Sequence, residues 1–260
     1  MSKKIKKLLL KKNKQKIVSL TAYSKNIAKI LDKYCDIILV GDSMANVLYN
    51  MKDTNQITID NVIQHTMSVR QGVKKSLLVV DMPRKTCKNL TEAKKNAKMI
   101  LKRTKCDAVK VESNNKNFNI IKGLVNSNIP VMGHIGYTPQ FKKKFNVEGK
   151  NKFEEYKLIK EAILIEKAGA FSIVLECITP SVAKKITGIL RIPTIGIGSS
   201  VHCDGQILVT DDILGLSGFY PKFVKRYVNV NRTIEKAVKK YSKEIKTKVF
   251  PSKKNFLYGK

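Results

Sequence analysis

The stretch SLLVVDMPRKTCKNLTEAKKNAKMILKRTKCDAVKVE, residues 76–112, contains a complete strand–helix–strand unit. Residues 76–81 and 108–112 are short, rich in β-branched side chains and nearly continuous in apolar character up to a terminal acid. That composition is typical of strands in a parallel sheet that is covered on both faces. Residues 91–103 have the apolar spacing of an amphipathic helix. The stretch therefore predicts two parallel strands joined by a crossover helix.

The same alternation runs along most of the chain. The predicted strands are residues 17–23, 36–42, 76–81, 108–112, 129–134, 171–176, 192–198 and 206–210. The predicted helices are residues 24–33, 59–72, 91–103, 116–127, 153–168 and 180–189. About eight such units in 260 residues favour an α/β fold of the closed (β/α)8 TIM-barrel type in a single domain. No Gly-rich dinucleotide fingerprint follows the first strand, which weighs against a doubly wound sheet.

We expect residues 1–260 to form one catalytic barrel domain. Residues 1–15 are expected to be a basic N-terminal segment, and residues 213–260 to be turns and a basic helical tail with a helix at 231–246. Asp60 and Thr91 are the predicted N-caps of their helices, because short polar side chains accept hydrogen bonds from the first free backbone N–H groups.

The formal charge of +31, from 51 Lys and Arg against 20 Asp and Glu, suggests two interpretations. A chain this basic can bind nucleic acid or anionic membranes through electrostatics. Alternatively, the lysines coat the outer faces of helices. They occur in nearly every segment and no basic patch is interleaved with aromatic residues, so we expect no specific nucleic-acid partner and no membrane partner.

The cysteine pattern and the hydropathy predict a cytoplasmic protein. The five cysteines are scattered and form no C-x-x-C pair, which fits a reducing compartment better than a disulfide framework. No apolar run approaches the roughly 18 residues that a spanning helix needs. The Lys-rich segment 1–15 contains only the run at 8–10, which is too short for a secretory signal.

Acidic residues stand where the predicted strands end. Asp42, Asp81, Glu112 and Glu176 close the second, third, fourth and sixth strands, and His134 closes the fifth. In a barrel these strand ends open on one face, where active sites are built. One such acid can be a helix cap, but four clustered carboxylates repel each other. Protonation or a hard cation with oxygen ligands relieves that repulsion, and Mg²⁺ fits this set best.

Three neighbouring side chains each have two interpretations. Lys110 precedes Glu112 by two positions and so shares its face of the strand; it either binds a substrate carboxylate or neutralises Glu112. Ser43 is a helix N-cap, a substrate hydrogen bond, or both. His134 is a polarising donor or a structural histidine.

These segments resemble the ketopantoate (3-methyl-2-oxobutanoate) hydroxymethyltransferase family over roughly residues 17–227. The matching segments are TAYS at 21–24, VGDSM at 40–44, HTMSVRQG at 65–72, VVDMP at 79–83, VKVE at 109–112, GHIGYTPQ at 133–140, LEC at 175–177, IPTIGIG at 192–198, DGQILV at 204–209 and YPKF at 220–223.

The resemblance implies a (β/α)8 barrel in a large homo-oligomer, a ring or decamer, acting in pantothenate synthesis. It implies one Mg²⁺ per subunit and transfer of a one-carbon unit from 5,10-methylenetetrahydrofolate to 3-methyl-2-oxobutanoate, giving 2-dehydropantoate. The family's roles map onto residues at the same motif positions. The implied metal ligands are Asp42, Asp81 and Glu112; the implied substrate contacts are Asp42, Ser43, Asp81 and Lys110, with His134 bonding the substrate or a metal-bound water; the implied catalytic base is Glu176.

The residues are suited to that chemistry. A 2-oxo acid chelates a divalent metal, which stabilises the enolate formed when the adjacent carbon loses its proton. Glu176 would take that proton, and the enolate would attack the folate's methylene group.

The chain departs from the family in two places. The usual Gly-rich lid is shortened to FKKKFNVEGK at 141–150, and the small turn after Gly198 reads SSVH at 199–202. Both changes predict altered folate affinity, the second because the loss of a glycine restricts the backbone.

A Mg²⁺-dependent lyase or mutase of the phosphoenolpyruvate-mutase and isocitrate-lyase type is the alternative enzyme class. Those barrels also hold Mg²⁺ at acidic strand ends. The lyases of this class carry a reactive cysteine in a K-K-C-G-H type loop, and this sequence contains no such loop.

Overall fold

The computed structural model describes residues 2–113, 117–142, 144–218 and 220–257. Its strands form one closed parallel barrel in the order β1 to β8, which confirms the predicted (β/α)8 fold. The strands are β1 (Ile17–Thr21), β2 (Ile37–Val40), β3 (Leu77–Asp81), β4 (Ala108–Glu112), β5 (Val131–Gly136), β6 (Ser172–Glu176), β7 (Thr194–Ile197) and β8 (Gly205–Leu208).

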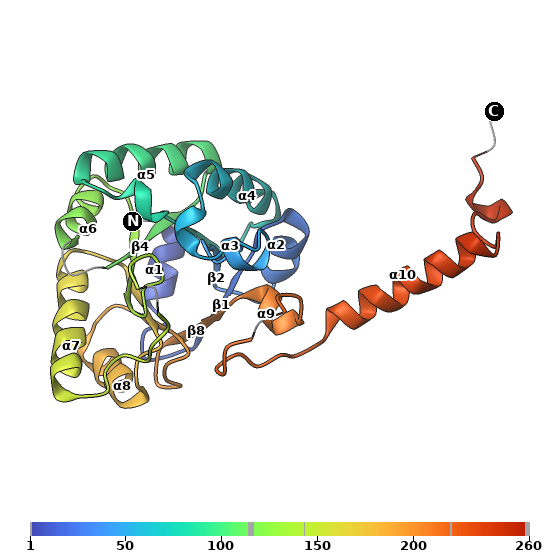
Figure 1. Cartoon of the computed structure of the whole chain (residues 1–260). Coiled ribbons are helices and arrows are strands. Elements are labelled where there is room, and N and C mark those ends of the chain that lie inside the picture. The colour runs from blue at the N-terminus through green and yellow to red at the C-terminus, as the bar shows by residue number, and fades with distance from the viewer. Residues whose placement is uncertain (1, 114–116, 143, 219, 258–260) are drawn as a thin grey trace. The chain divides into compact units, whose positions relative to one another are not determined.

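Long helices cover the outside of the barrel, as Figure 1 shows for α4 to α8. The α-helices are α1 (Lys3–Leu9), α2 (Lys25–Leu31), α3 (Met44–Val47), α4 (Ile59–Gly72), α5 (Leu90–Thr104), α6 (Phe118–Val125), α7 (Lys152–Lys167), α8 (Pro180–Ile189), α9 (Thr210–Leu214) and α10 (Val230–Lys246). The 3-10 helices are η1 (Thr54–Gln56), η2 (Arg84–Thr86) and η3 (Lys253–Asn255). The predicted helix 116–127 begins at Lys116, outside the described residues, and its described part is α6.

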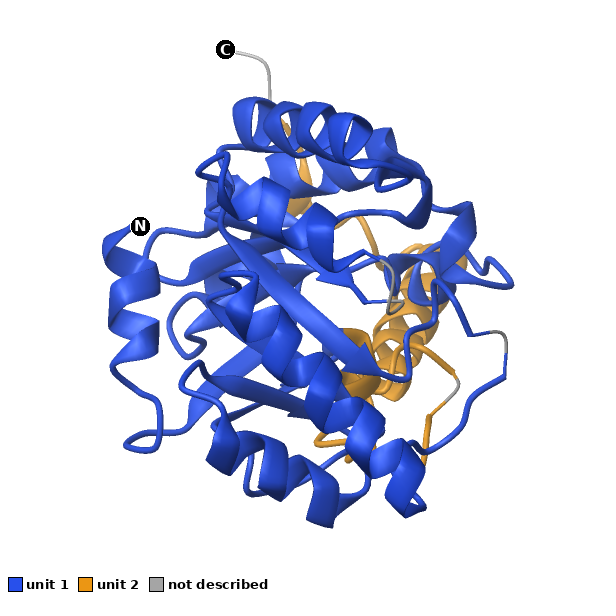
Figure 2. Cartoon of the chain, turned by 90° about the vertical axis from the view of Figure 1, so that its left-hand side faces the viewer, with its two compact units in different colours: residues 1–210 blue, residues 211–260 orange. Residues whose placement is uncertain are grey.

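The chain divides into two compact units, Met1–Thr210 and Asp211–Lys260 (Figure 2). All eight strands lie in the first unit. The second unit begins two residues before position 213, where the predicted tail starts.

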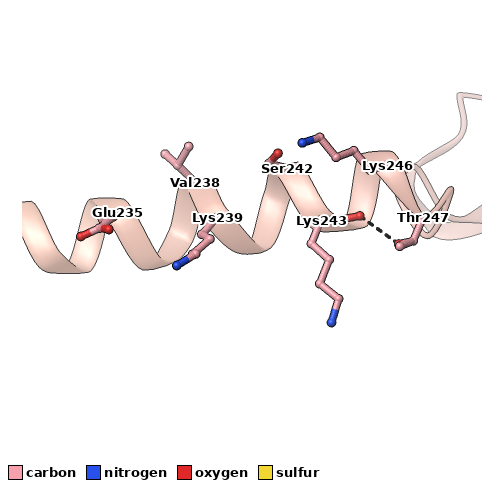
Figure 3. Close-up of a pocket in the computed structure, with 7 residues that line it drawn as sticks. All are labelled: Glu235, Val238, Lys239, Ser242, Lys243, Lys246 and Thr247. Carbon is pink, nitrogen blue, oxygen red and sulfur yellow. Dashed lines mark hydrogen bonds between the residues drawn. The ribbon is translucent and has the colours of Figure 1, made fainter.

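The second unit contains α10, none of whose residues is buried. Ile234, Val238, Tyr241 and Ile245 form an apolar stripe along it and are between 42% and 58% exposed. A shallow pocket on α10 is lined by side chains of that helix and the residue after it (Figure 3). A groove between neighbouring side chains of one helix does not enclose a ligand. Among the described helices, none has the length and apolar character needed to cross a bilayer.

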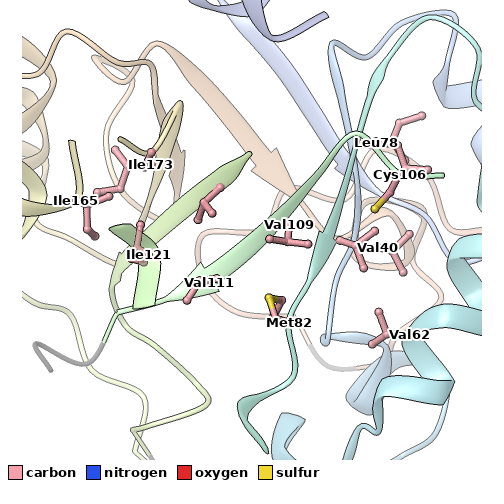
Figure 4. Packing of buried hydrophobic residues seen from close by; sticks show 14 of the residues in the cluster. Val40, Val62, Leu78, Met82, Cys106, Val109, Val111, Ile121, Ile165 and Ile173 are labelled. Carbon is pink, nitrogen blue, oxygen red and sulfur yellow. The ribbon is translucent and has the colours of Figure 1, made fainter. Parts of the chain in front are cut away.

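Alternation along the strands builds two cores. Successive side chains of a strand point to opposite faces, so β3 sends Leu77 and Val79 to the cluster inside the barrel, and Leu78 and Val80 to the cluster under the helices. Figure 4 shows part of this outer cluster, which includes Leu78 of β3 together with Val62 of α4 and Ile165 of α7. The same alternation places the last residue of β3, the acid that ends the strand, on the inside.

The N-terminal segment is a helix rather than only a basic arm. Ile5 and Leu8 of α1 are buried in the cluster inside the barrel. Lys4 donates to the Ser76 carbonyl at 2.8 Å and pairs with Asp107 at 3.0 Å. These partners immediately precede β3 and β4, so α1 closes the N-terminal end of the barrel and leaves the opposite end for the site.

The N-caps differ from those predicted. The side chain of Thr58 accepts from the Asn61 N–H in a capping box at the start of α4, and the side chain of Asn89 accepts from the Glu92 N–H at the start of α5. The predictions of Asp60 and Thr91 were wrong, because both helices begin within two residues before them and place them in the first turn.

Candidate active site

The barrel brings the predicted site residues to its C-terminal end. Asp81, Glu112 and Glu176 are the last residues of β3, β4 and β6, and His134 lies in β5. Asp42 follows β2 by two residues. Asp42, Asp81, Glu112 and His134 are all buried, and burial of four ionisable groups costs free energy unless they interact with each other.

Strand register pairs these groups. Asp81 is the register partner of Lys110 across β3 and β4, and the Lys110 ammonium lies 2.9 Å from Asp81 Oδ1. Glu112 is the register partner of His134 across β4 and β5. His134 Nδ1 lies 3.6 Å from Glu112 Oε1, and its Nε2 lies 3.1 Å from Glu176 Oε2. The imidazole therefore stands between two carboxylates.

The electrostatics favour charged Lys110 and protonated His134. Burial lowers the pKa of Lys110, but the carboxylates of Asp81, Glu112 and Asp42 raise it by more than burial lowers it. The net shift of the pKa is therefore upward. Burial and the charge of Lys110 lower the pKa of His134, while its bonds to Glu112 and Glu176 raise it to about 9. Lys110 Nζ lies 3.3 Å from His134 Nδ1. His134 Nδ1 therefore lies near both the Lys110 ammonium and the Glu112 carboxylate.

Asp42 lies in the most anionic part of the site. Burial, and then the charges of Asp81 and Glu112, raise the pKa of Asp42 well above its usual value. Its backbone N–H donates to Asp81 Oδ2 at 2.9 Å, which holds the two residues together. A bound cation would relieve the repulsion between Asp42 and these two carboxylates.

Gln140, which the sequence analysis did not single out, touches two of the carboxylates. Its Nε2 donates to Asp42 Oδ2 at 2.9 Å and to the Met82 carbonyl at 3.1 Å. Its backbone N–H donates to Glu112 Oε2 at 3.0 Å. Gln140 lies in the matched GYTPQ segment, but an amide in a loop has no spacing pattern that predicts such contacts.

Ser43 occupies the N-cap position of α3 but makes no side-chain capping bond. Its Oγ instead lies 2.8 Å from the Tyr23 hydroxyl. The Tyr23 carbonyl contacts His65 Nδ1 at 2.8 Å, and His65 Nε2 contacts the Tyr49 hydroxyl at 2.8 Å. Ser43 is thus the N-cap residue by position, as predicted, but its side chain does not cap the helix. Tyr23 is a second residue that sequence reasoning missed.

The contacts of Lys110 bear on one of its two interpretations, the neutralisation of Glu112. Its closest acid is Asp81 rather than Glu112, because those two residues are in register on adjacent strands. Neutralisation of Glu112 alone is therefore not its role.

The donor set fits a hard cation held partly by other oxygens. Asp81 Oδ1, Glu112 Oε1 and His134 Nε2 are buried and make no well-formed hydrogen bond within the described part of the chain, although each lies near a charged group. Among the described residues, no three His, Cys, Asp or Glu side chains are grouped closely enough to hold a metal by themselves. Mg²⁺ typically binds through one or two carboxylates, with water and substrate oxygens completing its octahedron.

The shortened segment 141–150 is attached to the barrel rim, although its Lys143 lies outside the described residues. Lys142 donates to the Gly136 carbonyl at 2.8 Å and pairs with Glu148 at 2.8 Å. The Arg84 guanidinium lies over the Phe141 ring, with 5.2 Å between its Cζ and the centre of the ring.

The turn at 199–202 does not require glycine. All four of its residues are described, and none has a positive φ, whereas the preceding Gly198 has φ of 56°. The left-handed backbone conformation that favours glycine is therefore at Gly198, before the turn.

The match to known proteins extends over almost the whole chain. The family model described as Ketopantoate hydroxymethyltransferase matches residues 2–253. A 3-methyl-2-oxobutanoate hydroxymethyltransferase of Pelagibacter ubique (strain HTCC1062) is 52% identical over 255 residues, which cover 98% of this chain and 99% of that protein. A second 3-methyl-2-oxobutanoate hydroxymethyltransferase, from Thermosipho africanus (strain TCF52B), is 46% identical over 257 residues. These cover 96% of this chain and 97% of that protein.

Solved structures share the architecture at low identity. A phosphoenolpyruvate phosphomutase from Streptomyces platensis subsp. rosaceus superposes with a TM-score of 0.63 at 10% identity, covering 94% of this chain and 87% of that one. A phosphonopyruvate hydrolase in complex with oxalate and Mg²⁺ superposes with a TM-score of 0.62 at 12% identity, covering 97% of this chain and 93% of that one. At such identities the likeness shows the fold alone.

Proposed function

The chain belongs to the ketopantoate hydroxymethyltransferase family, and we propose that it transfers a hydroxymethyl unit from 5,10-methylenetetrahydrofolate to 3-methyl-2-oxobutanoate. The product is 2-dehydropantoate, a precursor in pantothenate synthesis. The observation that carries this proposal is the buried cluster in which Lys110 and His134 alternate with carboxylates from four strand ends. Such a cluster suits a small dianionic transition state that needs both cations and a base.

Asp42 and Asp81, together with Glu112, would hold one Mg²⁺ per subunit. When bound, the ion polarises the keto and carboxylate oxygens of the 2-oxo acid and so eases removal of the neighbouring carbon-bound proton. The support is the chemistry of the donor set and the upward pKa shift of Asp42, which burial and two adjacent carboxylates cause. The Mg²⁺ of the phosphonopyruvate hydrolase complex is a property of that protein.

Lys110 and Ser43 would orient the 2-oxo acid. The Lys110 ammonium is buried and its pKa is raised by three carboxylates, so it stays charged and can bind the substrate carboxylate. Ser43 Oγ, held by the Tyr23 hydroxyl, adds a hydrogen bond to the same molecule. Fixing the substrate in this way lowers the barrier by aligning its acidic C–H bond with the base.

Glu176 would be that base. It is the more exposed of the two acids beside His134, with 18% of its side chain exposed against 1% for Glu112, so a substrate can reach it. His134 Nε2 lies 3.1 Å from the Glu176 carboxylate, close enough to limit its orientation. The carbon nucleophile left after proton removal then forms a C–C bond to the one-carbon unit of the folate. Water breaks the two C–N bonds of that unit, supplies the hydroxyl oxygen of the product and leaves tetrahydrofolate.

The lyase or mutase alternative has weaker support. Its members share the fold at 10% to 12% identity, whereas the hydroxymethyltransferases match nearly end to end. Cys177 follows Glu176, but burial and then the charge of Glu176 raise the pKa of this thiol to about 12. A thiol that stays protonated does not supply the reactive cysteine of the lyases.

The family resemblance also implies a large homo-oligomer, a ring or decamer, and a cytoplasmic location. Light scattering of the purified chain would measure the assembly, and a mass of one 29.3 kDa chain would contradict it.

The proposed activity is tested with purified protein, Mg²⁺, 3-methyl-2-oxobutanoate and 5,10-methylenetetrahydrofolate, following 2-dehydropantoate by mass spectrometry. We expect product that disappears when a chelator removes the metal and returns when Mg²⁺ is restored. Folded protein that forms no product would refute the assignment. Cleavage of phosphonopyruvate or 2-methylisocitrate instead would favour the lyase or mutase class.

A further inference from the structure

Gln140 connects the loop after β5 to the ends of three other strands. It lies four residues beyond β5 (Val131–Gly136), yet it is only 4% exposed. Its amide nitrogen reaches Asp42 beyond β2 and the Met82 carbonyl beyond β3, and its backbone N–H reaches Glu112 at the end of β4. A buried loop residue with three such bonds is fixed in one position.

The partner of Asp42 differs in kind from the partners of the other acids. Asp81 pairs with the Lys110 ammonium, and Glu112 and Glu176 flank the His134 ring. Asp42 receives its side-chain hydrogen bond from the neutral amide of Gln140. An amide orients a carboxylate without cancelling its charge, so Asp42 keeps its attraction for a cation.

We propose that Gln140 is a positioning residue that presets Asp42 and Glu112 for the divalent cation. This inference rests on the proposed function and deepens it. The Gln140 side chain selects the orientation of the Asp42 carboxylate, and its backbone N–H selects that of Glu112, so one loop residue aligns ligands from two strands. Outer-shell hydrogen bonds of this kind typically change metal affinity by about 10- to 100-fold.

The chemistry of the side chain is specific to this role. A lysine here would neutralise Asp42 and compete with the cation, and a glutamate would add a further charge to a site whose carboxylates already repel each other. Only the backbone contact to Glu112 survives when the side chain is replaced. Side-chain variants therefore test the Asp42 half of the proposal by itself.

The test is a titration of the full-length chain with Mn²⁺, followed by the paramagnetic resonance signal of the free ion, without substrate. The variants are Gln140→Met, which keeps the length of the side chain and removes the amide, and Gln140→Ala. The control is Asn96→Ala. It removes a hydrogen bond of 2.9 Å that the side-chain amide of Asn96, in α5, donates to the Thr86 carbonyl at the end of η2. Thermal unfolding without metal verifies that each variant is folded.

We expect Mn²⁺ to bind about 10- to 100-fold more weakly to both Gln140 variants and equally well to Asn96→Ala and the unaltered chain. Unchanged affinity in a folded Gln140→Met protein would overturn this inference and leave the proposed function standing. If the unaltered chain bound no Mn²⁺, both the metal site of the proposed function and this inference would fall.

Discussion

His134 Nε2 lies 3.1 Å from Glu176 Oε2, although 42 positions separate the two residues in the chain. The contact forms because β5 and β6 are adjacent and parallel, with Gly136 in register with Glu176. Two residues before Gly136, His134 reaches the end of β6 on one side and Glu112 on the other. One imidazole thus links the proposed base to the proposed metal carboxylates.

Replacing Glu176 with glutamine should strongly slow removal of the substrate's carbon-bound proton. The amide keeps the shape of the side chain but cannot accept the proton, so we expect exchange with solvent to slow by about 100- to 10,000-fold. Deuterium uptake by 3-methyl-2-oxobutanoate, measured by proton NMR without folate, reports this step.

Substrate affinity is the control for that variant. Calorimetric binding of the 2-oxo acid should change little, because Glu176 is not among the residues proposed to hold the substrate. Normal exchange in Glu176→Gln would remove this residue from the role of base.

Removing the Tyr23 hydroxyl should weaken substrate binding through Ser43. The Tyr23–Ser43 bond of 2.8 Å sets the direction of Ser43 Oγ, and loss of one such bond typically costs about 0.5–1.5 kcal/mol. We therefore expect Tyr23→Phe to raise KM for the 2-oxo acid by about 2- to 10-fold, with a smaller change in kcat.

Tyr49→Phe is the matched comparison for Tyr23→Phe. Tyr49 donates or accepts at His65 Nε2 over the same distance of 2.8 Å but does not contact Ser43 in the described structure. Steady-state kinetics of the two variants should differ in KM; equal values would show that Ser43 is positioned without Tyr23.

Asp204 should make stability depend on pH at the closed end of the barrel. Burial raises its pKa, but hydrogen bonds from Lys12, the Thr194 N–H and the Asn13 N–H lower it, and the net shift is downward. The unfolded carboxyl is therefore protonated first as pH falls. The stabilisation is fully present above the unfolded value of about 4 and is lost as pH falls through the lower folded value.

Asp204→Asn should lower the free energy of unfolding by about 3–5 kcal/mol at pH 7, because it leaves the largely buried Lys12 ammonium without its carboxylate and with only the Thr187 carbonyl as an acceptor. The Lys12–Asp204 pair is 2.8 Å long with side chains 9% and 3% exposed. Urea unfolding at pH 7 and pH 3 should show this difference shrinking at the lower pH. Asp60→Asn, which removes an exposed pair with Arg103, should have little effect at either pH.

Lys12 and Lys4 also bear on the charge of +31. The lysines of the N-terminal segment include residues that pair with the acids before β4 and β8. These pairs give two N-terminal lysines a structural role, although the net charge of +31 is unchanged by them. That role was not predictable from composition, because the acids lie about 100 to 190 positions away.

The order of strands and helices, and the set of acids at the strand ends, could be determined from the sequence. Apolar runs of strand length recur, and the alternation of strand side chains fixes which face each terminal acid shares. Asp81, Glu112 and His134 are predictable as neighbours because all barrel strands end on one side. The resemblance in motifs then assigns roles to them.

Only the tertiary structure decided which group meets which. Closure of the barrel sets the strand register, which places Asp81 beside Lys110 and Glu112 beside His134. Gln140 comes from a loop with no periodic pattern, yet it reaches two carboxylates. The physical reason is range: periodicity is encoded by neighbours in the chain, whereas pairing between strand ends depends on contacts between residues that are far apart in sequence.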